Sequence, residues 1–277
     1  DQIFNKLTPG LKKISFDGIG EPLLNNHLCY FIEKSSRAGI YTHTTTNGML
    51  LTKDILQSLK SAGLKNLNIS IDAPCAEVYE KIRQGANFDK LRKNLRFIRE
   101  TNFDSFCEVV VWFVGAAENL HLFPSMVDFV KSFGIKKLVM QVEQSWGKVF
   151  WEKIGKENPR VNEDPDKDFL KKIIHEAKDR GKKSGVTVSY VNVPDVSSAR
   201  ACKWPWKGFY ISVDGYITPC CIHGTNPQIL NFGNIFNEEI DLILNNEKYV
   251  KFRGDLKSKK IPKFCQGCTG YFKPLKI

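Results

Sequence analysis

Residues 12–22 have the sequence Lys-Lys-Ile-Ser-Phe-Asp-Gly-Ile-Gly-Glu-Pro. The first six residues (12–17) form a short, partly apolar segment typical of a β-strand, and the glycines and proline that follow end it. A helix is expected directly afterwards, because Asn25 or Asn26 can cap its start and Gly39 can end it. This succession of strand, glycine-rich loop and helix is the unit from which we expect the fold to be built.

The same succession repeats along the first two thirds of the chain. Helices are predicted between Thr52 and Gly63, over about residues 88–101, and over residues 124–133. Since strands alternate with helices through short connections, the pattern predicts an α/β fold with parallel strands and right-handed crossovers. The predicted strands are residues 12–17, 40–46, 66–72, 107–114 and 137–142.

Small or polar residues stand at the ends of four predicted strands. Taken alone, each of these strand ends is typical of an ordinary turn, since glycine allows positive φ and Asn-Gly is a frequent turn pair. Parallel sheets and barrels bind ligands at the carboxyl ends of their strands, so four such ends in one sheet favour a ligand-binding rim. The four segments are residues 17–22, 45–48, 70–72 and 141–143.

Three of these segments resemble the motifs of a known family. Gly20-Glu21-Pro22 resembles the glycine-glycine-glutamate-proline signature of radical S-adenosylmethionine (radical SAM) enzymes. Thr46-Asn47-Gly48 and Ser70-Ile71-Asp72 resemble the next two strand-end motifs of that superfamily, in the same order. The resemblance implies that residues 1–193 form a partial (β/α)6 TIM-like barrel that binds S-adenosylmethionine.

The resemblance also implies roles for single residues. Backbone groups around Gly20 and Glu21 would hold the methionyl ammonium group of the cofactor, and the nearby Gly18 permits a close approach of the backbone. Ser70 and Asp72 would meet the ribose or the carboxylate, and Arg83 would pair with the methionyl carboxylate. The predicted cofactor-binding residues are therefore Gly18, Gly20, Glu21, Asn47, Ser70, Asp72 and Arg83.

Two features depart from the family pattern. Ile19 occupies a position where many members have glycine. The C-x3-C-x2-C loop that holds the catalytic four-iron cluster is expected before the glycine-rich segment, whereas the first cysteine of this chain is Cys29. Residues 1–10 are predicted to be the end of the helix that follows this loop in the family. We therefore expect the first strand and the ligands of the catalytic cluster to lie upstream of Asp1; the alternative is a family member that has lost the cluster.

The last third of the chain contains five of the eight cysteines. A secreted disulfide-rich protein is usually shorter and more evenly studded with cysteine, so this clustering favours a metal or redox site. Cys265-Gln266-Gly267-Cys268 places two thiolates on one turn, which suits zinc or an iron–sulfur cluster equally. Two further thiolates, from Cys202 and Cys220, would complete a set of four ligands.

The spacing Cys202-x12-Gly215-x4-Cys220 resembles the auxiliary-cluster (SPASM) domain of the same superfamily, in its smaller one-cluster "twitch" form. By this resemblance, residues 194–277 form a small α+β domain in which Cys202, Cys220, Cys265 and Cys268 bind an auxiliary 4Fe-4S cluster. Cys221 competes with Cys220 for the site. Adjacent residues of a strand point to opposite sides, so only one of them joins the site readily, and its distance from Gly215 favours Cys220.

Three secondary-structure predictions accompany this domain. Asp214-Gly215 is a strong signal for a hairpin turn, residues 238–252 have a helical apolar pattern, and residues 194–201 are expected to be a polar connection.

Three functions remain open from the sequence. The first is a radical SAM oxidoreductase that abstracts hydrogen from a small polar substrate, with Gln141 and Glu143 as the hypothetical catalytic residues facing it. The second is a peptide maturase of the same superfamily. The third is a non-enzymatic, zinc-stabilised binding protein with a basic tail. Either enzyme would need an electron donor such as flavodoxin or ferredoxin.

The charge distribution does little to distinguish between possible binding partners. The net charge is +11, and residues 248–277 hold nine Lys or Arg but a single acid, Asp255. Such a stretch is either a solvated surface or a positive field that attracts an anionic substrate or an acidic peptide. Nucleic acid is disfavoured because few aromatic residues are interleaved. With no run of about 18 apolar residues and no signal peptide, we expect a cytoplasmic protein without membrane spans.

Overall fold

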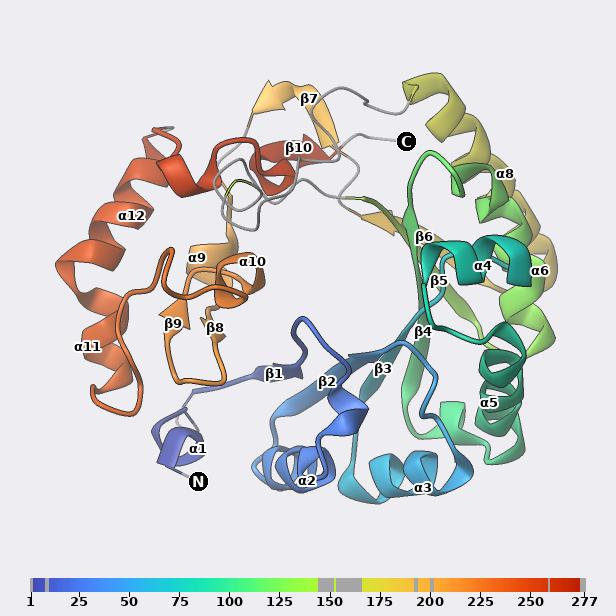
Figure 1. Ribbon diagram of the computed structural model, residues 1–277, viewed down its shortest axis with the longest axis horizontal. Helices are drawn as coiled ribbons and strands as arrows, with labels where there is room; N and C mark the ends of the chain where they lie inside the picture. The colour runs from blue at the N-terminus through green and yellow to red at the C-terminus, as the bar shows by residue number, and fades with distance from the viewer. Residues whose placement is uncertain are drawn as a thin grey trace. The chain divides into compact units, whose positions relative to one another are not determined.

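The computed structural model describes residues 2–7, 10–143, 152, 166–191, 194–199, 202–258 and 260–274. The chain divides into two compact units (Figure 1). The barrel unit consists mainly of Lys12–Glu143 and Pro165–Val191, and the cysteine unit of Asp1–Leu11, Gln144–Asp164 and Asn192–Lys276. The family resemblance predicts one domain over residues 1–193, whereas residues 1–11 belong to the same unit as residues 192–276 in the structure.

The barrel unit is built on one six-stranded sheet in the order β1-β2-β3-β4-β5-β6, and every neighbouring pair is parallel. The predicted α/β fold class with parallel strands is thus confirmed. Each of the five strands predicted from the sequence is present, with ends that differ by no more than a few residues. The strands are β1 (Lys13–Phe16), β2 (Tyr41–Thr46), β3 (Asn66–Ser70), β4 (Glu108–Gly115), β5 (Lys137–Val142) and β6 (Thr187–Val191).

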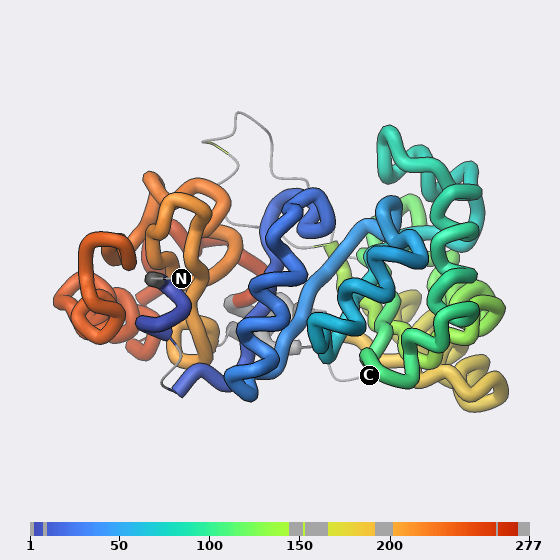
Figure 2. Tube along the Cα trace, turned by 90° about the horizontal axis from the view of Figure 1, so that it is seen from below, coloured from blue at the N-terminus to red at the C-terminus, as the bar shows by residue number. Residues whose placement is uncertain are grey.

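The helices of the barrel unit all lie on one face of this sheet, the outer side in Figure 1. Figure 2 shows that they follow one another in chain order, with α2 beside α3 and α6 beside α8. They are α2 (Leu28–Arg37), α3 (Lys53–Ala62), α4 (Ala76–Ile82), α5 (Phe88–Glu100), α6 (Phe123–Ser132) and α8 (Lys167–Ser184). Short 3-10 segments are Pro22–Leu24, Phe103–Ser105 and Leu120–Leu122.

The two faces of the sheet differ in chemistry because successive side chains of a strand point to opposite sides. In β3, Ile69 lies on the helix-covered face, close to the point where Leu91 of α5 packs, and both side chains are fully buried. The alternate residues Asn66, Asn68 and Ser70 therefore lie on the opposite face. In β3, the apolar side chains thus face the helices, and the polar side chains line the other face.

The cysteine unit consists of short elements. Its sheets are two antiparallel pairs, β8 with β9 and β7 with β10. The hairpin predicted at Asp214-Gly215 is confirmed, with Gly215 at φ 83°. The elements are α1 (Gln2–Leu7), β7 (Pro194–Ala199), α9 (Trp204–Lys207), β8 (Tyr210–Ile211), β9 (Ile217–Thr218), α10 (Cys221–Gly224), α11 (Ile240–Asn245), α12 (Glu247–Lys257), β10 (Phe272–Pro274) and the 3-10 segments Lys263–Cys265 and Thr269–Tyr271.

Two predictions for this unit were wrong. The single helix expected over residues 238–252 is two helices, because Asn246 is extended (φ −67°, ψ 160°) and its side chain accepts a hydrogen bond from Tyr249 N as the cap of α12. The polar connection expected over residues 194–201 contains β7. Its partner, β10, lies more than 70 residues later in the chain, so no local pattern marks the pairing.

Apolar packing and one lysine hold the cysteine unit together. The rings of Phe232 and Tyr249 are stacked at 4.0 Å in a buried cluster with Ile217 and Ile243, against which α1 also packs. Lys6 of α1 donates to the carbonyls of Ile235 (3.2 Å) and Glu238 (3.1 Å) and pairs with Glu239 (3.0 Å). These contacts explain why the first helix belongs to this unit.

Asn119 supports the carboxyl ends of β3 and β4. Fully buried, it donates from Nδ2 to the carbonyls of Asp72 and Val114, both at 2.9 Å, and accepts from Ala116 N at 2.7 Å. We predict that Asn119→Leu lowers the free energy of unfolding by about 2–4 kcal/mol, because it removes the hydrogen-bond partner of three buried or half-buried backbone groups. Urea denaturation measures this effect. The same substitution at the exposed Asn26 should change stability by less than about 0.5 kcal/mol; equal effects at both positions would contradict the assignment.

Candidate cofactor and cluster sites

The glycine-rich segment after β1 is held at its end by the carboxylate of Glu21. Its Oε1 accepts from Thr46 Oγ1 (2.7 Å) and Leu23 N (3.2 Å), and its Oε2 accepts from Asn47 N (2.8 Å). Between β1 and this anchor, Gly18 and Gly20 are exposed, and Gly20 has φ 134°, a conformation that favours glycine. The segment thus presents its backbone to solvent while Glu21 binds it to the end of β2.

The predicted Asn47 shapes the neighbouring loop. Its Oδ1 accepts from Met49 N at 2.8 Å, so the side chain closes a turn, while its own N–H is bound to Glu21. Sequence reasoning missed a supporting residue here: buried Asn94 of α5 donates to the carbonyls of Gly48 (2.8 Å) and Met49 (3.1 Å). A polar residue on the apolar face of a predicted helix was the available signal.

Asp72 and Arg83 form an ion pair, with 2.7 Å between Oδ2 and Nη2. The other carboxylate oxygen of Asp72 accepts from Val114 N at 2.9 Å, so protein groups occupy both oxygens. The Nε of Arg83 is buried and has no hydrogen-bond partner among the described residues. The hydroxyl of Tyr79, a fully buried residue, also has none there. The unused donors of Arg83 fit a methionyl carboxylate. Ser70, the last residue of β3, is half-buried beside this pair.

Gln141 and Glu143 lie at the end of β5. Both are half-buried, and two positions apart on an extended chain their side chains point to one side. Glu143 N donates to the carbonyl of Gly115 at the end of β4 (2.8 Å). Within the described part of the chain, no hydrogen bond or ion pair joins either side chain to the other predicted residues, and their substrate contact stays a prediction.

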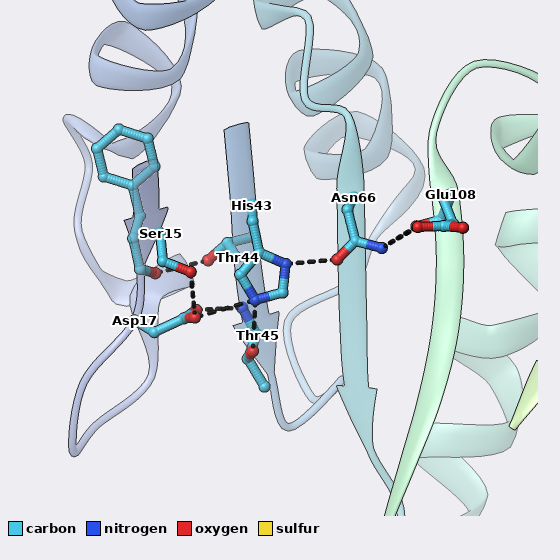
Figure 3. A network of polar contacts seen from close by, with 8 residues as sticks. Ser15, Asp17, His43, Thr44, Thr45, Asn66 and Glu108 are labelled. Carbon is cyan, nitrogen blue, oxygen red and sulfur yellow. Dashed lines mark hydrogen bonds and ion pairs between the residues drawn. The ribbon is translucent and has the colours of Figure 1, made fainter. Parts of the chain in front are cut away.

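A second missed feature is a row of polar side chains across the sheet (Figure 3). His43 Nε2 lies 3.0 Å from Asp17 Oδ2, and His43 Nδ1 is hydrogen-bonded to Asn66 Oδ1. Asn66 in turn donates to Glu108, which pairs with Lys137. The interactions run from the residue after β1 to the first residue of β5. Each residue is unremarkable in the sequence, and the strand register brings them together.

Asp17 joins this row to the glycine-rich segment. Burial raises the pKa of its carboxyl, but the hydrogen bond and charge of His43 and the hydrogen bonds from Ser15 and Thr45 N outweigh burial. The net pKa of Asp17 is therefore below its ordinary value of 3.8.

A lowered pKa means that ionised Asp17 stabilises the fold. This contribution is fully present above the unfolded-state pKa, about 3.9, and is lost as the pH falls through the lower folded-state pKa. We predict that Asp17→Asn destabilises the protein fully above about pH 5, and that the difference from the parent protein shrinks below about pH 4. Urea denaturation at a series of pH values measures it. A difference independent of pH would contradict the prediction.

The four predicted cysteine ligands come from separate elements of the cysteine unit. Cys220 precedes α10 in an extended conformation, Cys202 precedes α9, and the 265–268 turn is closed by a hydrogen bond from Cys268 N to Cys265 O (3.2 Å). Cys221 is exposed and begins α10, so the expectation that both adjacent cysteines belong to a strand was wrong.

Burial and mutual repulsion make these thiols hard to ionise. Burial, followed by the charges of Cys221 and Cys268, raises the pKa of Cys220 to about 12. Burial, followed by the charges of Cys202 and Cys221, raises the pKa of Cys268 to about 11. Burial and then Cys268, Cys220 and Cys202 raise the pKa of Cys265 further.

The four thiols are thus close enough to act on one another. Bound iron would relieve this repulsion, because thiolates are the form that binds metal. Among the described residues, no group of three or more His, Cys, Asp or Glu side chains is arranged to hold a single metal ion. The donor set of four thiolates is the one that iron–sulfur clusters use, and these residues fit such a cluster.

The choice between Cys220 and Cys221 can be tested directly. We predict that Cys220→Ser abolishes the auxiliary cluster, whereas Cys221→Ser retains about four iron atoms at this site, because Cys220 is half-buried and Cys221 is exposed. Iron and sulfide analysis after anaerobic reconstitution measures both variants. Loss of iron in Cys221→Ser with retention in Cys220→Ser would reverse the assignment.

Comparison with known families agrees with both sites. Residues 3–130 match the family described as the Radical SAM superfamily, and residues 202–269 match SPASM, described as an iron-sulfur cluster-binding domain. The chain belongs to the radical SAM superfamily. It is a radical SAM enzyme with a SPASM domain, the family that binds S-adenosylmethionine and 4Fe-4S clusters.

Known relatives are distant. The chain is 27% identical over 222 residues to the probable GTP 3′,8-cyclase of Methanocaldococcus jannaschii, covering 78% of this chain and 71% of the relative. It is 26% identical over 265 residues to the PqqA peptide cyclase of Bradyrhizobium diazoefficiens, covering 93% and 66%. The structure of SuiB from Streptococcus suis matches with a TM-score of 0.70 at 15% identity, over 91% of this chain and 60% of SuiB.

The SuiB match supports the partial-barrel fold, and the chain spans less than two thirds of SuiB. Within the described residues, no helix has both the length and the apolar character to cross a membrane.

Proposed function

We propose that this radical SAM enzyme oxidises a small polar substrate by two electrons, with an auxiliary 4Fe-4S cluster on Cys202, Cys220, Cys265 and Cys268. The presence of all four cysteines in one small unit carries the proposal. The match to an iron-sulfur cluster-binding domain argues against the zinc-stabilised binding protein.

The residues of the barrel unit would bind and orient the cofactor. The backbone of Gly18–Gly20 is the proposed contact for the methionyl ammonium, and Arg83 for the carboxylate, with Asp72 fixing the guanidinium through the 2.7 Å ion pair. When bound, S-adenosylmethionine supplies a hydrogen-abstracting 5′-deoxyadenosyl radical and the auxiliary cluster a one-electron acceptor, so that the substrate loses one hydrogen atom, one electron and one proton.

The released proton needs an acceptor. Glu143 is our proposed base, because it follows β5 at the carboxyl edge of the sheet and its side chain shares a side with Gln141. Gln141 would hold the reacting substrate group by a hydrogen bond. An electron donor such as flavodoxin or ferredoxin is proposed as the partner, and this reducing chemistry suits the cytoplasmic location expected from the sequence.

Peptide maturation is the second candidate. The peptide cyclase relative covers 93% of this chain, and SuiB has been solved bound to its precursor peptide SuiA. Basic residues in the cysteine unit would suit an acidic peptide. The GTP cyclase relative supports a small anionic substrate instead.

The experiment uses the protein expressed from its complete gene, reconstituted anaerobically and reduced in the presence of S-adenosylmethionine. We expect 5′-deoxyadenosine and methionine to form. We also expect that Cys265→Ala still forms 5′-deoxyadenosine but no oxidised product, because the electron acceptor is lost. Glu143→Ala should lower kcat by about 100-fold, the usual size of a general-base effect.

Mass spectrometry of products from sugar, cyclitol, nucleotide and peptide libraries separates the two candidates. A two-electron loss from a small molecule supports the first, and a cross-linked or epimerised peptide supports the second. Absence of 5′-deoxyadenosine, or the absence of a C-x3-C-x2-C motif from the complete gene product, would refute the radical mechanism.

A further inference from the structure

The polar row of Figure 3 contains a histidine between two acceptors. His43, Asn66 and Glu108 are direct register partners on β2, β3 and β4, so their side chains lie on one face of the sheet. The side chain of His43 is 10% exposed. Its ring contacts Asp17, Thr45 and Asn66. Ser15 binds Asp17, and Glu108 and Lys137 continue the row beyond Asn66.

The far end of the row fixes the orientation of Asn66. Lys137 lowers the pKa of Glu108, first through its hydrogen bond and also through its charge, so Glu108 is a carboxylate. The Nδ2 of Asn66 lies 2.9 Å from Glu108 Oε2 and 3.2 Å from the Glu108 carbonyl. Two acceptors require a donor at this position, and therefore Asn66 turns its Oδ1, an acceptor, toward His43 Nδ1.

At the other end of the row, Asp17 is a second hydrogen-bond acceptor beside the His43 ring. Asp17 Oδ2 lies 3.0 Å from His43 Nε2 and also accepts from Ser15 Oγ (2.9 Å), while Asp17 Oδ1 accepts from Thr45 N (2.6 Å). A carboxylate offers no proton. Because Nδ1 faces an amide oxygen and Nε2 faces a carboxylate, both ring nitrogens must carry hydrogen. A neutral imidazole would turn the lone pair of one ring nitrogen toward an acceptor oxygen, and two acceptors facing one another repel.

We propose that His43 is held as an imidazolium cation and that it is a positioning residue, fixing Asp17 and through it the start of the Gly18–Glu21 segment. The second part rests on the proposed role of this segment in binding S-adenosylmethionine; the first part does not. Asp17 and Glu21 then anchor the two ends of the exposed segment to consecutive residues at the end of β2, Thr45 to Asn47. The cation keeps the first anchor in place.

Asp17 and His43 act as a unit because separating them has a free-energy cost. Removing the cation leaves the half-buried Asp17 carboxylate with only neutral donors, which is unfavourable. The carboxylate would then protonate or turn toward water, and Thr45 N would lose its acceptor. Either change releases the first glycine of the segment from β2.

The protonation state is tested by 15N NMR of the histidine-labelled, iron–sulfur-loaded protein at about pH 7.5, with His43→Gln to assign the signals. We expect two protonated ring nitrogens for His43. The signals of the exposed His27, His121 and His175 are recorded in the same spectra for comparison. One protonated and one bare nitrogen at His43 would overturn the proposal, whatever the enzyme's activity.

The positioning role is tested by S-adenosylmethionine cleavage kinetics. We expect His43→Gln to raise the KM for S-adenosylmethionine about tenfold, with a much smaller change in kcat, because the binding segment loses an anchor while the reacting groups remain. His175→Gln, on the exposed face of α8, is the matched control and should leave both constants unchanged.

A double variant separates the positioning role from a merely structural one. Asp17→Asn combined with His43→Gln removes the unpaired charge that His43→Gln alone leaves, so the double variant should bind S-adenosylmethionine at least as well as His43→Gln alone. Additive losses, or an unchanged KM in His43→Gln, would refute the positioning role. If the parent protein formed no 5′-deoxyadenosine, the proposed function would fail while the NMR result still decided the protonation state.

Discussion

The carboxylate of Glu21 is the interaction on which the cofactor segment depends. At the carboxyl end of a parallel sheet the ladder of hydrogen bonds stops, so backbone N–H groups beyond the last pair need other acceptors. Glu21 supplies them for Leu23 and Asn47 and also binds the hydroxyl of Thr46. A side chain from the loop after β1 thereby fixes the loop after β2, and Gly18–Gly20 can stay exposed without being loose.

The same constraint recurs along the edge of the sheet. Asp17 accepts a hydrogen bond from Thr45 N, and Asp72 accepts one from Val114 N. The Asn119 side chain donates to the carbonyls of Asp72 and Val114. Acidic and amide side chains after one strand satisfy the backbone of the next, so that the rim forms a connected set of anchors. Each of the two carboxylates also has a basic partner, His43 for Asp17 and Arg83 for Asp72, which holds it in place. Function and fold share these residues.

The cysteine unit is stabilised in a different way. Its strands are two or three residues long, apart from β7, and its apolar core centres on the stacked rings of Phe232 and Tyr249. Small units of this kind commonly need a metal or disulfides in addition to a core. Burial and neighbouring charges raise the pKa of Cys220, Cys265 and Cys268, so these thiols stay neutral without a metal, and a bound cluster would cross-link the residues before α9 and α10 to the turn at residues 265–268.

The sequence by itself determined the strand–helix alternation, the order of the first five strands and the four-cysteine pattern, because periodicity, glycine turns and ligand spacing are local signals. Residues such as Thr52 and Gly63, which cap and end α3 as predicted, act within their own helix. Only the tertiary structure decided that β7 pairs with β10, that a cap at Asn246 divides a predicted helix, and that α1 joins the cysteine unit. Above all, the row from Asp17 to Lys137 arises from register between strands up to 120 residues apart in the chain. Which side chains face one another across a sheet is fixed by non-local pairing, and for that reason no single segment encodes it.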